Sequence, residues 1–278
     1  MRHMYRNNMR AIIAILLLLS SGVLNAETLK YDVSYKGAFT AFSWANIADA
    51  SLSTRKQVPC GNAQTCLNSR VRMTSENHKV LESLYPMRFY YQSFFQQNPA
   101  RTLAFEKREK KSKSKYQPYG YRHKLVTISG DGKSATIHEL WSTGEPLASN
   151  EKRYVSTDHN GGKPPSVKKR STSPVATNAL DRWAMIYTAR FLPYSKGFSQ
   201  TFPGTTGTHK LTYKVSLEGT ERVRARGRDF EAWKVSIVET KAGKRQPTLY
   251  MWISADDSRL PVRIEMEEEI GRLRFVLK

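Results

Sequence analysis

Apolar and polar residues alternate along most of the chain after residue 26. Leu29, Tyr31, Val33 and Tyr35 share one parity, and polar residues occupy the positions between them. A period of two is typical of a strand that is buried on one face only. Comparable runs predict further strands at 39–54, 69–75, 87–95, 101–109, 122–129, 133–140, 211–217, 221–228, 230–239, 248–253, 260–270 and 272–277.

One segment has helical spacing instead. Its apolar residues follow each other at steps of three and four, which places them on one stripe of a helix: Leu180, Trp183, Ala184, Tyr187 and Phe191. Asn178 suits the N-cap, with Asp181 three residues on, and Pro193 ends the helix. An amphipathic helix among strands must bury its stripe against a sheet.

Two further signals concern turns and loops. Gly130-Asp131-Gly132 between two strand-like runs indicates a hairpin. Residues 160–175 are rich in Gly, Pro, Ser and Lys and predict a flexible basic loop. The fold class expected is therefore mainly β: a long antiparallel curved sheet, half-barrel or open barrel, with one packed amphipathic helix.

The first 26 residues have the three parts of a secretory signal. Arg2, Arg6 and Arg10 precede an apolar run at 11–19, and small residues lead to Ala26. We expect cleavage near Ala26 and a periplasmic location, with residues 27–278 forming one β-rich domain. An uncleaved anchor is the alternative, although the apolar run is short for crossing a bilayer.

Charge narrows the choice of partners. The chain carries a net charge of +21 at pH 7. Basic chains commonly bind nucleic acid, but an exported protein does not meet it, so no nucleic acid is expected. Lipopolysaccharide, anionic lipid and acidic glycans are the candidate partners, and peripheral contact with a membrane is compatible with them. The charge can also lack a single partner.

Cys60 and Cys66 are the only cysteines. In an oxidising compartment two nearby cysteines most simply form a disulfide. A structural metal site would need more ligands than the chain offers near them. No metal site and no cofactor is expected.

Two groups of side chains are candidates for ligand binding. Arg222, Arg224, Arg226 and Arg228 alternate with small or apolar residues, which in one continuous strand would put four guanidinium groups on one face. An ordinary solvated face or a charged edge explains the row equally well. Trp183 and Tyr187 either line an apolar groove or simply join the helix to the sheet.

Carboxylates suggest a different chemistry. Glu265, Glu267 and Glu269 share one parity of a predicted strand, and glycoside cleavage uses two carboxyl groups. Cross-strand ion pairs with arginines are the simpler explanation. The sequence contains no serine-nucleophile elbow and no histidines at metal-ligand spacing.

Several segments resemble a known family. LDRWAMIYTAR (180–190), the run at 213–235 and YMWISADDSRLPVRIEME (250–267) resemble the domain of unknown function family 3108, as does LKYDVSYKG (29–37). The Trp-Ile-Ser-x-Asp element that leads to Leu-Pro-Val at 252–262 is the most specific. The resemblance implies an exported protein of Gram-negative bacteria with a β-rich, half-barrel-like domain. It implies no reaction and no catalytic residues.

Three functions are compatible with these observations. The first is a non-catalytic periplasmic binding or carrier protein for an anionic envelope ligand: lipopolysaccharide, anionic lipid or acidic glycan. The second is an envelope-glycan hydrolase that uses the paired carboxylates. The third is an envelope assembly or interaction factor without a small ligand.

Overall fold

A computed structural model describes residues 26–60, 65–84, 86–110, 121–142, 167–268 and 271–278. In these residues, fifteen strands form a single sheet in which every pair of neighbouring strands is antiparallel. The strands follow the order β8-β7-β6-β5-β4-β3-β2-β1-β15-β14-β13-β11-β10-β9, and β12 pairs with β11. The two edge strands do not pair with each other, so the sheet is open, and the expected fold class is confirmed.

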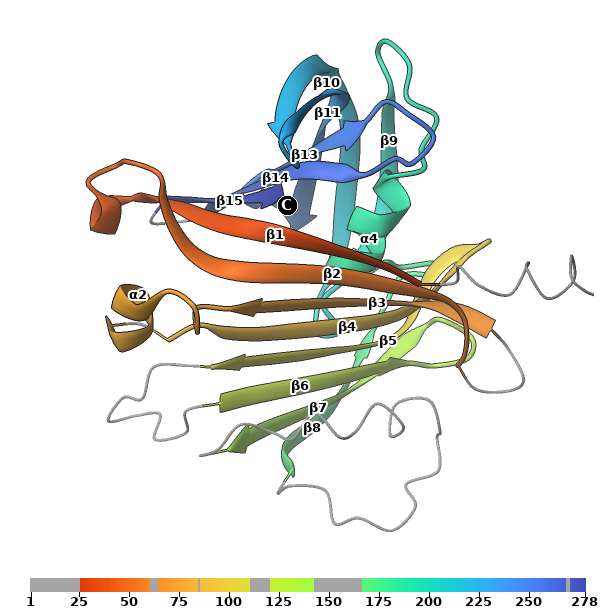
Figure 1. Cartoon of the computed structure of the whole chain (residues 1–278). Helices are drawn as coiled ribbons and strands as arrows, with labels where there is room; N and C mark the ends of the chain where they lie inside the picture. The colour runs from red at the N-terminus through yellow and green to blue at the C-terminus, as the bar shows by residue number, and fades with distance from the viewer. Residues whose placement is uncertain (1–25, 61–64, 85, 111–120, 143–166, 269–270) are drawn as a thin grey trace, which may run out of the picture.

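Two arms meet where β1 pairs with β15 (Figure 1). The N-terminal arm consists of β1 (Ala26–Gly37), β2 (Ala45–Pro59), β3 (Thr65–Thr74), β4 (Arg88–Gln97), β5 (Ala100–Lys110), β6 (Tyr121–Ile128), β7 (Ser134–Ser142) and β8 (Val167–Pro174). The C-terminal arm consists of β9 (Ser199–Thr205), β10 (Lys210–Ala225), β11 (Arg228–Lys241), β12 (Lys244–Arg245), β13 (Leu249–Ser254), β14 (Pro261–Glu268) and β15 (Gly271–Leu277). Short helices complete the described fold: η1 (Ala38–Thr40), α2 (Lys79–Leu84) and α4 (Arg182–Ala189).

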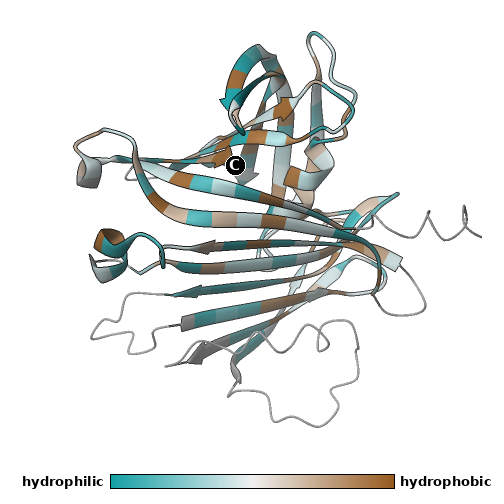
Figure 2. Ribbon diagram, in the orientation of Figure 1, coloured by the Kyte–Doolittle hydropathy of each residue, from teal (hydrophilic) through white to brown (hydrophobic). Residues whose placement is uncertain are grey.

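The sheet is curved so that its two arms face each other. Register shifts interrupt the pairing of β1 with β2, of β4 with β5 and of β10 with β11, and β-bulges bend a strand and increase its twist. Figure 2 shows brown and teal positions alternating along β1 and β2. The apolar parity of β1 (Leu29, Tyr31 and Val33) is buried and belongs to the main core. This is the alternation that the sequence predicted, and the core lies on the concave side.

Helix α4 occupies part of the concave side. It begins at Arg182, and its N-cap is Asp181, whose side chain accepts hydrogen bonds from the Trp183 and Ala184 amides. The prediction that Asn178 caps the helix was wrong, because Asn178 is in the left-handed region with φ 58°. The helix is buried on most sides, Met185 and Ile186 included, because both arms pack around it. The apolar stripe in the sequence predicted burial on one face of the helix only, so the helix is more buried than predicted.

The carboxylate of Asp181 also ties the helix to the N-terminal arm. Ser93 on β4 and Thr102 on β5 donate hydroxyl hydrogen bonds to it, the second at 2.8 Å. The Thr102 amide donates to the Ala179 carbonyl at 3.0 Å, and Leu180 bridges to Gly204 at β9. The segment that leads into α4 therefore spans both arms.

Three predicted segments differ from the structure. The strand predicted at 39–54 begins only at Ala45, after η1, and extends to Pro59. Val167–Pro174 forms edge strand β8, so the flexible loop predicted at 160–175 was wrong for these eight residues; residues 160–166 lie outside the described residues. The arginine run is a hairpin and not one strand. Arg226 and Gly227 both have positive φ, 50° and 71°, and form the turn between β10 and β11.

Cys60 and Cys66 flank residues 61–64, which lie outside the described residues. Both thiols are unbridged in this structure. Their side chains lie within hydrogen-bonding reach of each other, and burial raises the pKa of both thiols. The disulfide stays a prediction, as does the signal at residues 1–26, of which only Ala26 is described.

We predict that Gly271→Ala destabilises the junction between the arms. Gly271 has φ 158°, and a Cβ there would lie 2.4 Å from the Lys36 carbonyl oxygen. The expected loss is about 1–3 kcal/mol of unfolding free energy, measured by denaturant unfolding. Gly130→Ala is the control, since nothing lies within 4 Å of its added Cβ. Equal stability of both variants would contradict this account of the junction.

Candidate functional site

Two adjoining hollows lie between the arms beside α4. The first has a volume of about 490 Å³ and the second about 420 Å³. Arg182, Tyr213, Glu239 and Met266 line both, so the hollows share a wall. Each volume falls within the range of roughly 300–1,000 Å³ that is usual for small-molecule sites.

The first hollow has an apolar wall. It is built from both arms and from the helix: Val71, Met73, Phe89, Tyr91, Phe105, Trp183, Leu273 and Phe275. The Tyr91 ring stacks on that of Phe105 with centroids 5.7 Å apart, and Trp183 lies 6.1 Å from Tyr91. These rings form a continuous apolar surface that a hydrocarbon chain can contact.

Basic side chains face the same hollow from β5 and β6. Lys107 and Lys124 are directly opposite each other in the antiparallel register, and both line the hollow. Lys107 pairs with Glu109 at 2.8 Å. Lys124 donates from Nζ to the Thr206 carbonyl oxygen at 2.8 Å, and among the described residues it has no ion pair. Like charges directly opposite each other destabilise a sheet.

The surroundings of Lys124 lower the pKa of its ammonium group. Burial lowers the pKa of its ammonium group most strongly; Glu139 acts in the opposite direction, and the positive charges of Arg122, Lys107 and Lys241 lower the pKa further. A bound anion close to Nζ would reverse this effect, because an opposite charge nearby stabilises the ammonium form.

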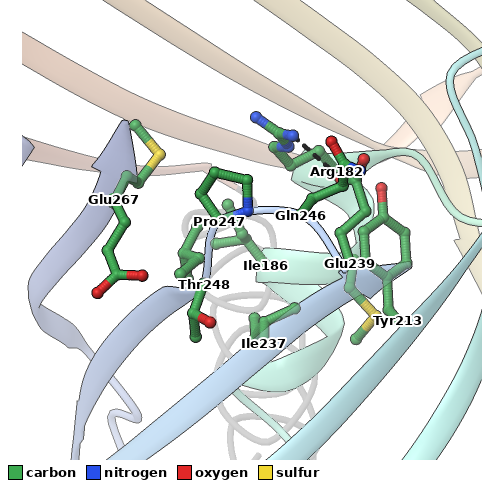
Figure 3. Close-up of a pocket in the computed structure, with 12 residues that line it drawn as sticks. Arg182, Ile186, Tyr213, Ile237, Glu239, Gln246, Pro247, Thr248 and Glu267 are labelled. Atoms are coloured by element: carbon green, nitrogen blue, oxygen red, sulfur yellow. Dashed lines mark hydrogen bonds and ion pairs between the residues drawn. The ribbon is translucent and has the colours of Figure 1, made fainter. Parts of the chain in front are cut away.

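Arg182 lines both hollows, and Figure 3 shows it beside Glu239 at the second hollow. Its guanidinium pairs with Glu239 at 3.0 Å. Burial acts to lower the pKa of Arg182, but the neighbouring carboxylate of Glu239 raises it. Four cationic residues, including Arg122, and two carboxylates line the first hollow, which leaves an excess of positive charge there.

The two aromatic residues predicted to bind a ligand, Trp183 and Tyr187, occupy different positions. Trp183 lines the first hollow, although most of its surface is buried. Tyr187 instead packs edge-on against Phe95 with centroids 5.3 Å apart. Both residues therefore join the helix to the sheet. Only Trp183 of the two also lines the first hollow.

The four arginines do not form one row. Arg222 and Arg224 lie on β10, directly opposite the acidic residues Glu231 and Asp229 of β11. Arg226 is in the turn and donates to the Lys278 carbonyl oxygen at 2.7 Å, while Arg228 lies over the Phe230 ring. All four are exposed, and none lines either hollow. The prediction of one guanidinium face was wrong because the chain reverses at Arg226-Gly227.

The predicted carboxylates are held by arginines. Glu265 accepts hydrogen bonds from Nε of Arg263 at 2.8 Å and Nε of Arg274 at 2.7 Å. Burial alone would raise the pKa of Glu265, but these two bonds hold it below its ordinary value. Glu267 borders the second hollow and pairs with Arg272 at 3.3 Å; Glu269 lies outside the described residues. Glu265 is thus poorly suited to donate a proton.

The basic residues of the hollow were not singled out in the sequence. Lys107 and Lys124 fell within the strands predicted at 101–109 and 122–129, and they lie on β5 and β6. The alternation Phe105, Lys107, Glu109 was the available signal, since it continues an inward-facing parity beyond the last aromatic residue. This alternation alone did not show that β6 would place Lys124 opposite Lys107.

Comparison with protein families gives one match. The family model described as Protein of unknown function (DUF3108) matches residues 146–278. This C-terminal segment matches the DUF3108 family, as the resemblance in the sequence predicted. It contains α4 and all strands of the C-terminal arm, as the motifs after Leu180 predicted. The DUF3108 match does not include the opening strand at 29–37, nor Lys107 and Lys124.

Comparisons with other proteins address the fold. A search of curated proteins gives no match. The crystal structure of a beta-barrel-like protein of domain of unknown function DUF1849 from Brucella abortus is similar, with a TM-score of 0.52 and 9% sequence identity. The likeness covers 92% of this chain and 96% of that one. It extends beyond the DUF3108 segment to nearly the whole open barrel.

No helix among the described residues is long and apolar enough to span a membrane. No group of three or more His, Cys, Asp or Glu side chains among them is placed to hold a metal ion.

We predict that Glu265→Gln lowers stability in a pH-dependent way. The ionised carboxylate is favoured by folding, so its contribution is full above its unfolded pKa and is lost as pH falls through the lower folded pKa. At pH 7 the loss should be about 1–3 kcal/mol, and it should shrink as the pH falls below 4.5. Denaturant unfolding at several pH values measures it.

Glu267→Gln is the matched control for this experiment. Its side chain is 37% exposed and has one longer ion pair, so its effect should stay within about 0.5 kcal/mol. A difference at Glu265 that does not change with pH would contradict the ion-pair explanation.

Proposed function

We propose that this chain is a non-catalytic binding or carrier protein for an anionic amphiphile of the cell envelope, held in the concave hollows. The observation that carries the proposal is the pair Lys107 and Lys124, which lie directly opposite each other in the first hollow, beside its apolar wall and within an excess of positive charge. Two ammonium groups in such a place reduce stability. An acidic group bound between them would offset that cost.

The apolar wall supports the proposal that the ligand has a hydrocarbon tail. Phe89, Tyr91, Phe105 and Phe275 offer contact area for a hydrocarbon chain on the same cavity that holds the two lysines. A ligand with an acidic head and an apolar tail satisfies both features, whereas a purely polar glycan would leave the aromatic wall uncovered. Among the anionic partners considered from the sequence, lipids therefore fit better than glycans.

The proposed export of the protein to the cell envelope is inferred from the signal-like residues 1–26. Cleavage near Ala26 would release a periplasmic protein with the concave side available to lipids. The hydrolase alternative gains no support, because Glu265 is held ionised between Arg263 and Arg274. Binding without turnover is the simpler function for this cavity.

We predict that Lys107→Gln/Lys124→Gln weakens binding of an anionic probe. The probe is lysophosphatidylglycerol, and a monoacylglycerol of the same chain length is the neutral comparison. Affinity for the anionic probe should fall about 10- to 100-fold, because charge-assisted hydrogen bonds contribute roughly 1.5–3 kcal/mol. Affinity for the neutral probe should change little. Titration calorimetry below the micelle concentration measures both.

Arg222→Gln/Arg224→Gln is the control variant, since it removes two exposed positive charges outside the hollows. It should bind both probes like the unchanged protein. Raising the salt concentration should weaken binding of the anionic probe only. Failure of the unchanged protein to bind either probe, or equal losses in both double variants, would sink the proposal.

A further inference from the structure

Two exposed apolar side chains lie at one edge of the N-terminal arm. Phe42 is 70% exposed and Val80 is 76% exposed, and only Phe191 joins them among large apolar residues of the described chain. Phe42 follows η1, between β1 and β2, and Val80 is on α2, between β3 and β4. Figure 1 shows η1 and α2 at the same end of these strands.

The loop that carries Phe42 is held in a strained shape. Ala41 and Phe42 both have left-handed backbones, with φ 47° and 58°, which is uncommon for residues other than glycine. The Phe42 amide donates to the Gly37 carbonyl at 2.9 Å, and the Gly37 amide donates to the Thr40 hydroxyl at 3.1 Å. The loop therefore fixes an aromatic ring in solvent, at the cost of backbone strain.

The helix that carries Val80 is fixed in a similar way. Glu82 on α2 accepts two hydrogen bonds from Arg88 at the start of β4, at 2.9 and 2.7 Å. Ser75 donates to the same carboxylate at 2.6 Å. Leu81 packs against the core, while Val80 points to solvent. Single exposed apolar residues are ordinary, but two held at one edge form a pair of anchors.

The charges at this edge favour an anionic surface. Lys36 at the end of β1 and Lys79 at the start of α2 are exposed, and neither has an ion pair among the described residues. Lys36 is directly opposite Arg272, a second cation. Arg72 is 66% exposed and has only a long 3.9 Å contact with Glu76, which also pairs with Arg88.

The same edge adjoins the first hollow. Met73 and Phe89 line the hollow and lie one residue from the ends of β3 and β4 that α2 connects. Leu273, near the start of β15, lines it too. A surface that touches Phe42 and Val80 is therefore next to the apolar wall of the cavity.

We propose that the docking edge, formed by Phe42, Val80, Lys36 and Lys79, binds the surface of an anionic phospholipid bilayer. Phe42 and Val80 insert their side chains at the boundary of head groups and acyl chains, and the lysines contact the acidic head groups. This surface does not depend on the cavity ligand. It places the hollow beside a membrane, where an amphiphile can be exchanged.

The test is flotation of the protein cleaved at Ala26, residues 27–278, with vesicles of phosphatidylcholine and phosphatidylglycerol. The unchanged protein should bind these vesicles and bind pure phosphatidylcholine vesicles much more weakly. Phe42→Ser/Val80→Ser should reduce vesicle binding at least tenfold while leaving affinity for lysophosphatidylglycerol unchanged. Lys36→Gln/Lys79→Gln should reduce binding to the anionic vesicles only.

Phe191→Ser is the matched control. Phe191 is 46% exposed, and its neighbour Arg190 pairs with Glu27 at the opposite end of β1. This variant should bind vesicles like the unchanged protein. Vesicle binding that survives Phe42→Ser/Val80→Ser, that falls equally with Phe191→Ser, or that is absent from the start would overturn the docking edge. Retained affinity for the soluble probe in those cases would leave the cavity proposal intact.

Discussion

The buried carboxylate of Asp181 fixes how the concave side of this protein is divided. It is fully buried, and four hydrogen bonds compensate for that burial: two from hydroxyls of β4 and β5 and two from amides of α4. Burial raises the pKa of this group, and the same hydrogen bonds act to lower it. A polar node of this kind allows few alternative positions for the helix.

The position of the helix decides where a cavity remains. Tyr187 and its neighbours fill one end of the concave side against Phe95, and Trp183 forms the border. Beyond Trp183 the first hollow remains between the arms, with its apolar wall next to Lys107 and Lys124. The helix is thus a partial plug, which leaves the two hollows open beside it.

The sequence predicted most of the fold because most strands are buried on one face only. Apolar and polar residues therefore alternate along them with a period of two. The prediction failed where no such burial exists. β8 is an edge strand whose described side chains are mostly polar and exposed, so Val167–Pro174 resembled a loop. Arg226-Gly227 adopts a turn with two positive φ values, and Gly227 alone was a weak signal for it.

The candidate site was harder to predict than the fold, for a physical reason. Parity along a strand predicts which residues share a face, but the placement of Lys107 opposite Lys124 depends on the register between β5 and β6. Their enclosure depends further on the C-terminal arm, which supplies Tyr213 and Phe275 from more than eighty residues away. A binding surface made by strand pairing leaves no contiguous motif. The run of arginines at 222–228 was easy to notice because its residues lie close together in the sequence. In the structure this run forms a hairpin and does not line either hollow.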